Sequence, residues 1–263
     1  MKVFKKTSVS TLINILGMSV AFAAAMILLV RVRWDIGYDA NFKGHQQVFR
    51  MEHDLEEDGK FSTYLCRPLI ELLREVSSDV EAVGTAARWG DWILAREGNP
   101  GAGVTVSRCI VDSTFFQVFP FNWTEGSAKE FAAPATLILS QSIAKTFFGN
   151  EPAVGKYLQE GDGTRLRVVG VYEDMPANSS LAYQSFAYLG TEFLEDGSEW
   201  SFTAFLKLRN PADGISVQTQ FADFLMAYFS NGAELTEEQR EEFRREFRLA
   251  NLHEGYFQQD HES

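Results

Sequence analysis

The chain has 263 residues, of which 45% are hydrophobic and 13% aromatic, so it can form one or two compact domains and is not a disordered chain. Its charge is uneven: 19 of the 24 basic residues and all 36 acidic residues lie in residues 35–263, which carry a net charge of −17. Because an acidic surface repels phosphate backbones, we expect no nucleic-acid binding.

Residues 12–30 form an apolar run of 19 residues without a charge. A helix needs about 20 apolar residues to cross a hydrocarbon core of about 30 Å, so we expect a membrane-spanning helix over residues 12–34. Small residues such as Gly17, Ser19 and Ala21 lie along it. They either let another helix approach closely or merely face lipid, and the sequence leaves both interpretations open.

A cleaved signal peptide is the alternative, since the basic start, the apolar run and the alanines at 23–25 are its features. The run continues to Val30, beyond that cleavage site, which favours the membrane helix. Lysines at the start of the chain favour a cytoplasmic N-terminus, although Arg31 and Arg33 argue weakly against it. We therefore expect residues 1–11 in the cytoplasm and residues 35–263 outside it.

Beyond this helix, the apolar pattern predicts alternating strands and helices. The first group comprises strands over 47–55, 80–94 and 104–111, a helix over 64–76 and a short aromatic helix over 115–119. Cys66 and Cys109 could form a disulfide outside the cytoplasm, but the apolar neighbours of Cys109 favour a buried free thiol.

Residues 136–149 contain Ser142 and Lys145 at the spacing of the Ser-x-x-Lys nucleophile motif of β-lactamases. A strand over 136–139, an N-cap at Ser140, a helix and a stop at Gly149 account for the same residues without chemistry. A serine hydrolase also needs a base and an oxyanion site, and the companion Ser-Asp-Asn and Lys-Thr-Gly motifs are absent from the sequence. We therefore expect no catalytic residue.

The remaining elements are a hairpin with its tip at 160–164, a strand over 200–208, and helices over 213–229 and 236–248. The last helix begins with a capping box at Thr236. The hairpin tip superficially resembles a calcium loop but lacks the ladder of Asp and Asn ligands. The four histidines are scattered without ligand spacing, and no phosphate-binding loop occurs, so we expect neither a metal nor a cofactor.

Five blocks of sequence, in this order, resemble the MacB/FtsX-like ABC transporter permeases. They are T-L-I-N-I-L-G at 11–17, Y-D-A-N-F-K-G-H-Q-Q-V-F-R at 38–50, D-S-T-F-F-Q-V-F-P-F-N-W-T-E-G at 112–126, L-I-L-S-Q-S-I-A-K-T-F-F-G-N-E-P-A-V-G-K at 137–156, and V-V-G-V-Y-E-D-M-P-A-N-S-S-L at 168–181. The resemblance covers residues 8 to about 209. Each block is weak alone, and their combination is specific.

The resemblance implies an α+β fold: a two-lobed extracytoplasmic MacB-like periplasmic core over 35–263, after one N-terminal transmembrane helix. A β-rich lobe over about 84–200 would be inserted in the first lobe. The resemblance also implies a non-catalytic permease of the bacterial inner membrane, which couples the motion of a cytoplasmic ABC ATPase to an extracytoplasmic substrate or periplasmic partner. A permease dimer is implied as well. The alternative is a singly anchored extracytoplasmic serine hydrolase that uses Ser142 and Lys145.

The chain departs from the family pattern because no second apolar run long enough to span a membrane follows Val30. Residues 251–256 are expected to form the strand that would lead into the next membrane helix, and either a truncated chain or a natural fragment fits. No Gly or Pro interrupts residues 21–36, so the helix should continue into the outer domain. It would then transmit displacement or, alternatively, only anchor the domain. The phenylalanines at 115, 116, 119, 147 and 148 should form one core face.

Overall fold

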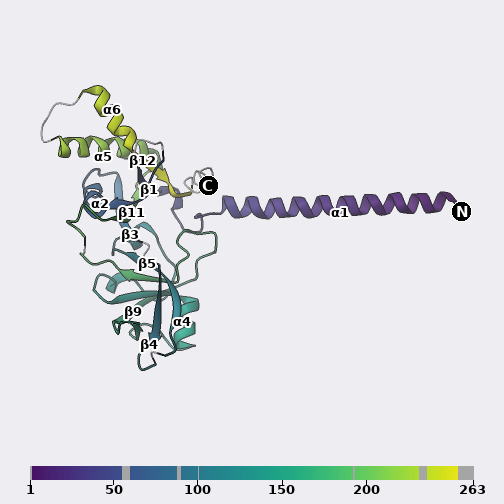
Figure 1. The fold of residues 1–263 in the computed structure, drawn as a ribbon, viewed down its shortest axis with the longest axis horizontal. Helices are drawn as coiled ribbons and strands as arrows, with labels where there is room; N and C mark the ends of the chain where they lie inside the picture. Colours follow the sequence, from purple (N-terminus) through teal and green to yellow (C-terminus); the bar gives the residue numbers. More distant parts are fainter. Residues whose placement is uncertain are drawn as a thin grey trace.

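The computed structural model describes residues 2–54, 60–87, 90–99, 101–191, 193–230 and 236–253. A long helix, α1 (Lys2–Ile36), projects from a folded outer domain (Figure 1). Within its segment Val9–Ile36, an 18-residue window has a mean hydropathy of 2.4, and none of that window is buried by the rest of the chain. By length and composition, α1 can therefore cross a membrane, and the expected span lies within it.

The outer domain is built on one mixed sheet. Its strands are β1 (Val48–His53), β2 (Leu65–Cys66), β3 (Val80–Ala87), β4 (Asp91–Arg96), β5 (Val104–Val111), β6 (Trp123–Gly126), β7 (Thr136–Ser140), β8 (Tyr157–Glu160), β9 (Arg165–Tyr172), β10 (Ser185–Tyr188), β11 (Trp200–Leu208) and β12 (Phe247–Asn251). The helices are α2 (Arg67–Leu73), α3 (Phe115–Val118), α4 (Gln141–Phe148), α5 (Gly214–Phe229) and α6 (Glu237–Glu246), with short 3-10 turns at η1 (His45–Gln47), η2 (Ala128–Glu130) and η3 (Pro211–Asp213).

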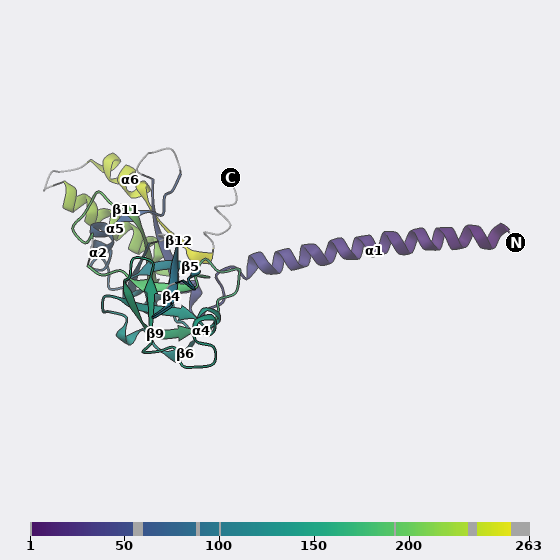
Figure 2. The same ribbon diagram turned by 60° about the horizontal axis from the view of Figure 1, so that its bottom comes forward.

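The strand order separates the two lobes. The order is β10-β7-β9-β8-β4-β5-β3-β11-β1-β12, and β10 also pairs with β5, so the first six strands close into a ring. Closure removes the exposed edges that an open sheet of this size would present. The strands of the ring all come from the middle of the chain, whereas β1, β11 and β12 come from its two ends. The predicted two-lobed α+β fold is thus confirmed, and Figure 2 shows the ring below the α5–α6 pair.

Several predicted elements differ from the observed ones in their bounds. The predicted helix over 64–76 shortens to α2, because Leu65 and Cys66 pair with β11 and Pro68 occupies the first turn. The predicted strand over 80–94 divides into β3 and β4 before Gly90, which has φ +76°. The predicted helix over 236–248 has its capping box at Thr236, but it ends at Glu246, where β12 begins to pair with β1. Only 251–253 of the predicted strand over 251–256 is described, and Asn251 ends β12.

The phenylalanines expected to share one core face lie in two cores. Phe115 and Phe119 are buried in an aromatic cluster beneath the base of α1, with Phe116 packed against it. Phe147 and Phe148 are also buried, but in the larger aliphatic core of the sheet. Their burial is as predicted and their grouping is wrong, because α3 packs on β3 whereas α4 packs on β7 and β9.

Both cysteines are buried and neither is in a disulfide, as expected for Cys109, whose thiol donates to the carbonyl of Ala87 at 3.6 Å. The residues at 160–164 turn the chain between β8 and β9, with Gly163 at φ +95°. This is the predicted hairpin.

Candidate functional site: the base of the membrane helix

The last turn of α1 is tied directly to a distant loop of the outer domain. The amide of Gly37 donates to the carbonyl of Arg33 at 3.1 Å, and the side chain of Asn178 donates to the carbonyl of Trp34 at 3.2 Å. A Cβ on Gly37 would lie 3.1 Å from Nδ2 of Asn178, which is a tight contact. A glycine at the end of the helix therefore allows the loop to approach and satisfy one of its terminal carbonyls.

Asp39 holds the same loop from the other side. Its buried carboxylate accepts hydrogen bonds from the hydroxyl of Ser179 at 2.9 Å and from the amide of Ser180 at 2.7 Å. Its own amide donates to the carbonyl of Asn178 at 3.1 Å. The backbone of Asp39 lies in the left-handed region, with φ +53°. We call the set Trp34, Asp39, Asn178, Ser179 and Ser180 the helix latch.

The electrostatics of the helix latch are set by burial. Burial raises the pKa of the Asp39 carboxyl above its ordinary value. The hydrogen bonds from Ser180 and Ser179 and the positive charge of Arg50 oppose that rise. The nearby phenol of Tyr38 also has a raised pKa, chiefly because it is partly buried and secondarily because of the charge of Asp39. The helix latch thus contains a carboxyl group whose protonation state should affect the stability of the fold.

The last described residues of the chain also lie at the base of α1. After β12, Nδ1 of His253 lies 2.8 Å from the carbonyl oxygen of Tyr38, and the side chain of Asn251 donates to the carbonyl of Gln46 at 3.0 Å. The rings of His45 and His253 lie 6.3 Å apart, edge to face. The sequence reading treated the histidines as scattered, and only the tertiary structure brings these two together. The first residues of the outer domain and its last described residue, His253, therefore meet at the base of α1.

Aromatic rings in contact with one another connect the base of α1 to both lobes. Phe42 packs edge to face on Phe119, with ring centroids 5.3 Å apart. Phe119 contacts Phe115 at 4.7 Å and Phe205 of β11 at 5.1 Å, and Phe115 contacts Phe186 of β10 at 5.7 Å. Since β11 and β10 belong to different lobes, one close-packed aromatic cluster joins them to the base of α1.

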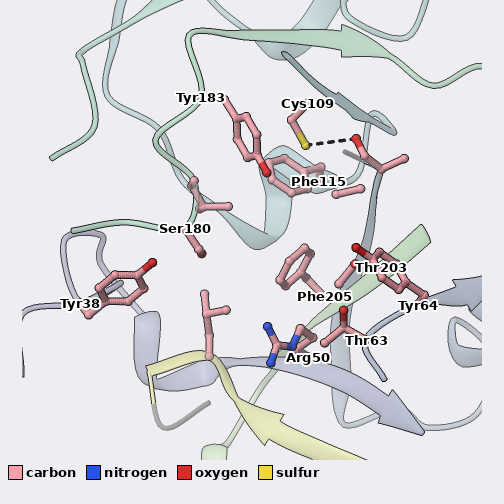
Figure 3. Close-up of a pocket in the computed structure, with 14 residues that line it drawn as sticks. Tyr38, Arg50, Thr63, Tyr64, Cys109, Phe115, Ser180, Tyr183, Thr203 and Phe205 are labelled. Atoms are coloured by element: carbon pink, nitrogen blue, oxygen red, sulfur yellow. Dashed lines mark hydrogen bonds between the residues drawn. The ribbon is translucent and has the colours of Figure 1, made fainter. Parts of the chain in front are cut away.

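Two hollows lie beside the helix latch, between the lobes. The first has a volume of about 280 Å³, and Figure 3 shows the hydroxyl of Tyr38, Ser180 and the guanidinium of Arg50 around it. The second, of about 290 Å³, shares Tyr38, Ser180 and Tyr183 with the first.

Arg50, which lines the first hollow, belongs to an ion-pair triad with Arg248 around the buried Glu52. The Nε atom of Arg50 lies 3.0 Å from one oxygen of Glu52, and the Nε atom of Arg248 lies 3.0 Å from the other. Glu52 is only 2% exposed, so its charge requires these two partners. The triad joins β1 to β12 in the lobe that adjoins α1.

Ser142 and Lys145 lie on α4, away from the helix latch. The hydroxyl and the amide of Ser142 both donate to the Asp174 carboxylate, at 2.9 and 3.1 Å, and the hydroxyl lies 3.2 Å from that of Ser140. A carboxylate that accepts from the first turn satisfies a helix N-terminus. Lys145 lines a separate shallow hollow beside Glu151. These contacts explain Ser142 as the anchor of α4 to the loop after β9.

The structure brings together two blocks that lie far apart in the sequence. The helix latch takes Asp39 from the block at 38–50, and Asn178, Ser179 and Ser180 from the block at 168–181. The sequence did not predict that these residues meet, and the only available signal was that both blocks contribute to the resemblance. Among the described residues, no group of three or more His, Cys, Asp or Glu side chains could hold a metal ion.

Comparison with known proteins agrees with this architecture. The family model of the MacB-like periplasmic core domain matches residues 11–224. The chain belongs to this family. A search of curated proteins finds no significant match.

Solved structures share the fold of this MacB-like chain at low sequence identity. A domain of a putative permease from Porphyromonas gingivalis has a TM-score of 0.61 at 17% identity, covering 80% of this chain and 91% of that one. The periplasmic region of MacB from Actinobacillus actinomycetemcomitans has a TM-score of 0.53 at 15% identity, covering 82% and 93%. The extracellular domain of YknZ, a noncanonic ABC-type transporter from Gram-positive bacteria, has a TM-score of 0.51 at 15% identity, covering 77% and 98%. The chain thus has the fold of an ABC transporter permease domain.

Proposed function

We propose that the chain is a non-catalytic permease component that couples motion driven by a cytoplasmic ABC ATPase to an extracytoplasmic substrate or partner. In this proposal, residues 1–11 lie in the cytoplasm, 12–34 span the bacterial inner membrane, and 35–263 lie in the periplasm, with the β-rich lobe over about 84–200. The permease acts as a dimer, and the ATPase engages it through its other membrane segments.

The helix latch is the observation that carries this proposal. The helix α1 runs without interruption to Ile36, and its last carbonyls are hydrogen-bonded to Gly37 and Asn178. A flexible linker would absorb displacement, whereas a continuous helix fixed to a packed domain passes displacement on. Because Asp39 and the aromatic cluster are joined to both lobes, movement of α1 shifts the outer domain relative to the membrane.

The contacts of Ser142 do not support the hydrolase alternative. Its hydroxyl hydrogen-bonds to Asp174 and so takes part in holding α4. A serine-reactive acylating probe tests this directly. Modification of Ser142 that is abolished by Lys145→Ala would overturn the non-catalytic proposal.

Insertion of a flexible segment tests transmission. In the complete permease, Gly-Ser-Gly-Ser placed after Arg33 should leave folding and ATPase assembly intact while it abolishes the transport or activation output. The matched control carries the same insertion after Gly161, at the exposed tip of the β8–β9 hairpin, and should retain its output. Full output from the Arg33 insertion would reduce α1 to an anchor.

A further inference from the structure

The largest of the described hollows lies far from the helix latch, between three helices. It has a volume of about 680 Å³, against about 280 and 290 Å³ for the two beside the latch. We call it the distal groove. Its walls are α2, the last turn of α5, the end of α6 and the segment that leads into β11. Figure 1 shows α2 and the end of α5 on the side of the domain away from α1.

Aromatic side chains at the distal groove are exposed to solvent. Tyr228 and Phe229 end α5 and are each 60% exposed, with their rings 5.3 Å apart, edge to face. Half-buried Trp200, Phe243 and Leu72 continue the apolar lining toward the core. Exposure of adjacent aromatic rings costs free energy in water, and aromatic residues are enriched where proteins bind other proteins.

The ionisable side chains that line the distal groove are acidic, although arginines lie beside them. Its lining contains three ionisable carboxylates, Glu71, Glu195 and Glu246, and neither a lysine nor an arginine. Glu71 is paired with Arg74 at 3.0 Å and with Arg67 at 3.6 Å, while Glu195 is exposed. The first turn of α6 adds Glu237 and Glu238, and its last turn carries Arg244 and Arg245. With the net charge of −17 on residues 35–263, this rim favours a cationic ligand.

We propose that the distal groove binds a cationic amphipathic helix of a partner protein. Its apolar face would cover Tyr228 and Phe229, and its flanking lysines or arginines would face the glutamate rim. A groove walled by helices suits a helix that inserts side chains at successive turns. The proposal rests on the proposed function only in placing the groove in the periplasm, where such a partner can reach it.

Binding of a defined peptide tests the groove independently of any ATPase. The probe is a labelled peptide of about 15 residues, or about four helical turns, with leucine and phenylalanine on one face and lysine on the other. A second peptide carries glutamate in place of every lysine. Fluorescence anisotropy is measured on the full chain in nanodiscs of zwitterionic lipid, with empty discs as the background.

The lysine peptide should bind, and added salt should weaken its binding, whereas the glutamate peptide should bind at least about tenfold more weakly. Tyr228→Ser combined with Phe229→Ser should weaken binding of the lysine peptide by about tenfold or more. The matched control is Ile215→Ser, which removes an 81%-exposed apolar side chain at the other end of α5 and should leave the affinity unchanged.

Three results would overturn the proposal. The first is equal binding of both peptides, and the second is an affinity that the double variant does not change. The third is self-association of the full chain that the double variant abolishes, since the groove would then bind a second copy. None of these results depends on the transport output, so they are distinct from failure of the Arg33 insertion test.

Discussion

The end of the outer domain next to α1 and the opposite end differ in how fully their side chains are packed and hydrogen-bonded. At the membrane-helix end, buried Asp39 has hydrogen-bond partners and Phe42 and Phe119 are packed against each other. At the opposite end, Tyr228 and Phe229 remain exposed beside unpaired apolar surface of the distal groove. Transmission of motion requires side chains that hold one another firmly, whereas binding of a partner requires uncovered surface. We call the first the coupling end and the second the recognition end, after the roles proposed for them.

Removing an aromatic ring from the coupling end should have the largest effect. Phe115 is fully buried and contacts rings from both lobes. Phe115→Ala should lower the free energy of unfolding by about 3–5 kcal/mol through lost burial and a residual cavity. Denaturant unfolding of the full chain in detergent measures it. A loss below about 1 kcal/mol would show that the cluster is loosely packed.

A methyl group added where α3 meets β3 should have the next largest effect. A Cβ on Gly84 would lie 2.8 Å from Cα of Phe115, and a backbone atom cannot move aside cheaply. We expect Gly84→Ala to cost about 1–3 kcal/mol in unfolding free energy. Gly101→Ala is the control, because no atom lies within 4 Å of its added Cβ. Equal stability of the two variants would mean that α3 is not held against β3.

Asp39 of the helix latch should make the folding stability of the chain depend on pH. Burial raises the pKa of Asp39. The contribution of Asp39 to folding stability is therefore present below the ordinary carboxyl pKa and is lost as the pH rises through the raised pKa of the folded protein. Asp39→Asn keeps the acceptor oxygen and removes the charge. Relative to the wild type, the variant's melting temperature should rise at neutral pH, and this gain should shrink in acid. A gain that is independent of pH would contradict the assignment.

The smallest effect is expected at the recognition end. Phe229→Ala removes the same ring as Phe115→Ala, but from a side chain that is 60% exposed. The unfolding free energy should change by no more than about 0.5 kcal/mol, measured under the conditions used for Phe115→Ala. A loss comparable to that of Phe115→Ala would mean that Phe229 is a core residue, and the contrast between the two ends would fail.

Local patterns in the sequence were sufficient for several elements. The strands β5 and β11 have the predicted bounds, and the capping box at Thr236 forms as its spacing indicates. The apolar run predicted the helix that can cross a membrane. These features depend on residues close in sequence, so period, capping and length suffice to predict them.

The sequence by itself determined the apolar helix, most strands and helices and, through its ordered blocks, the family. Only the tertiary structure decided that Asp39 meets Ser179 and Ser180, about 140 residues later, that His45 meets His253, and that the aromatic residues divide between two cores. It also decided where exposed aromatic rings and glutamates gather in the distal groove. The reason is physical: helix and strand formation follow from neighbours along the chain, whereas these contacts follow from strand order and ring closure, which local patterns do not encode.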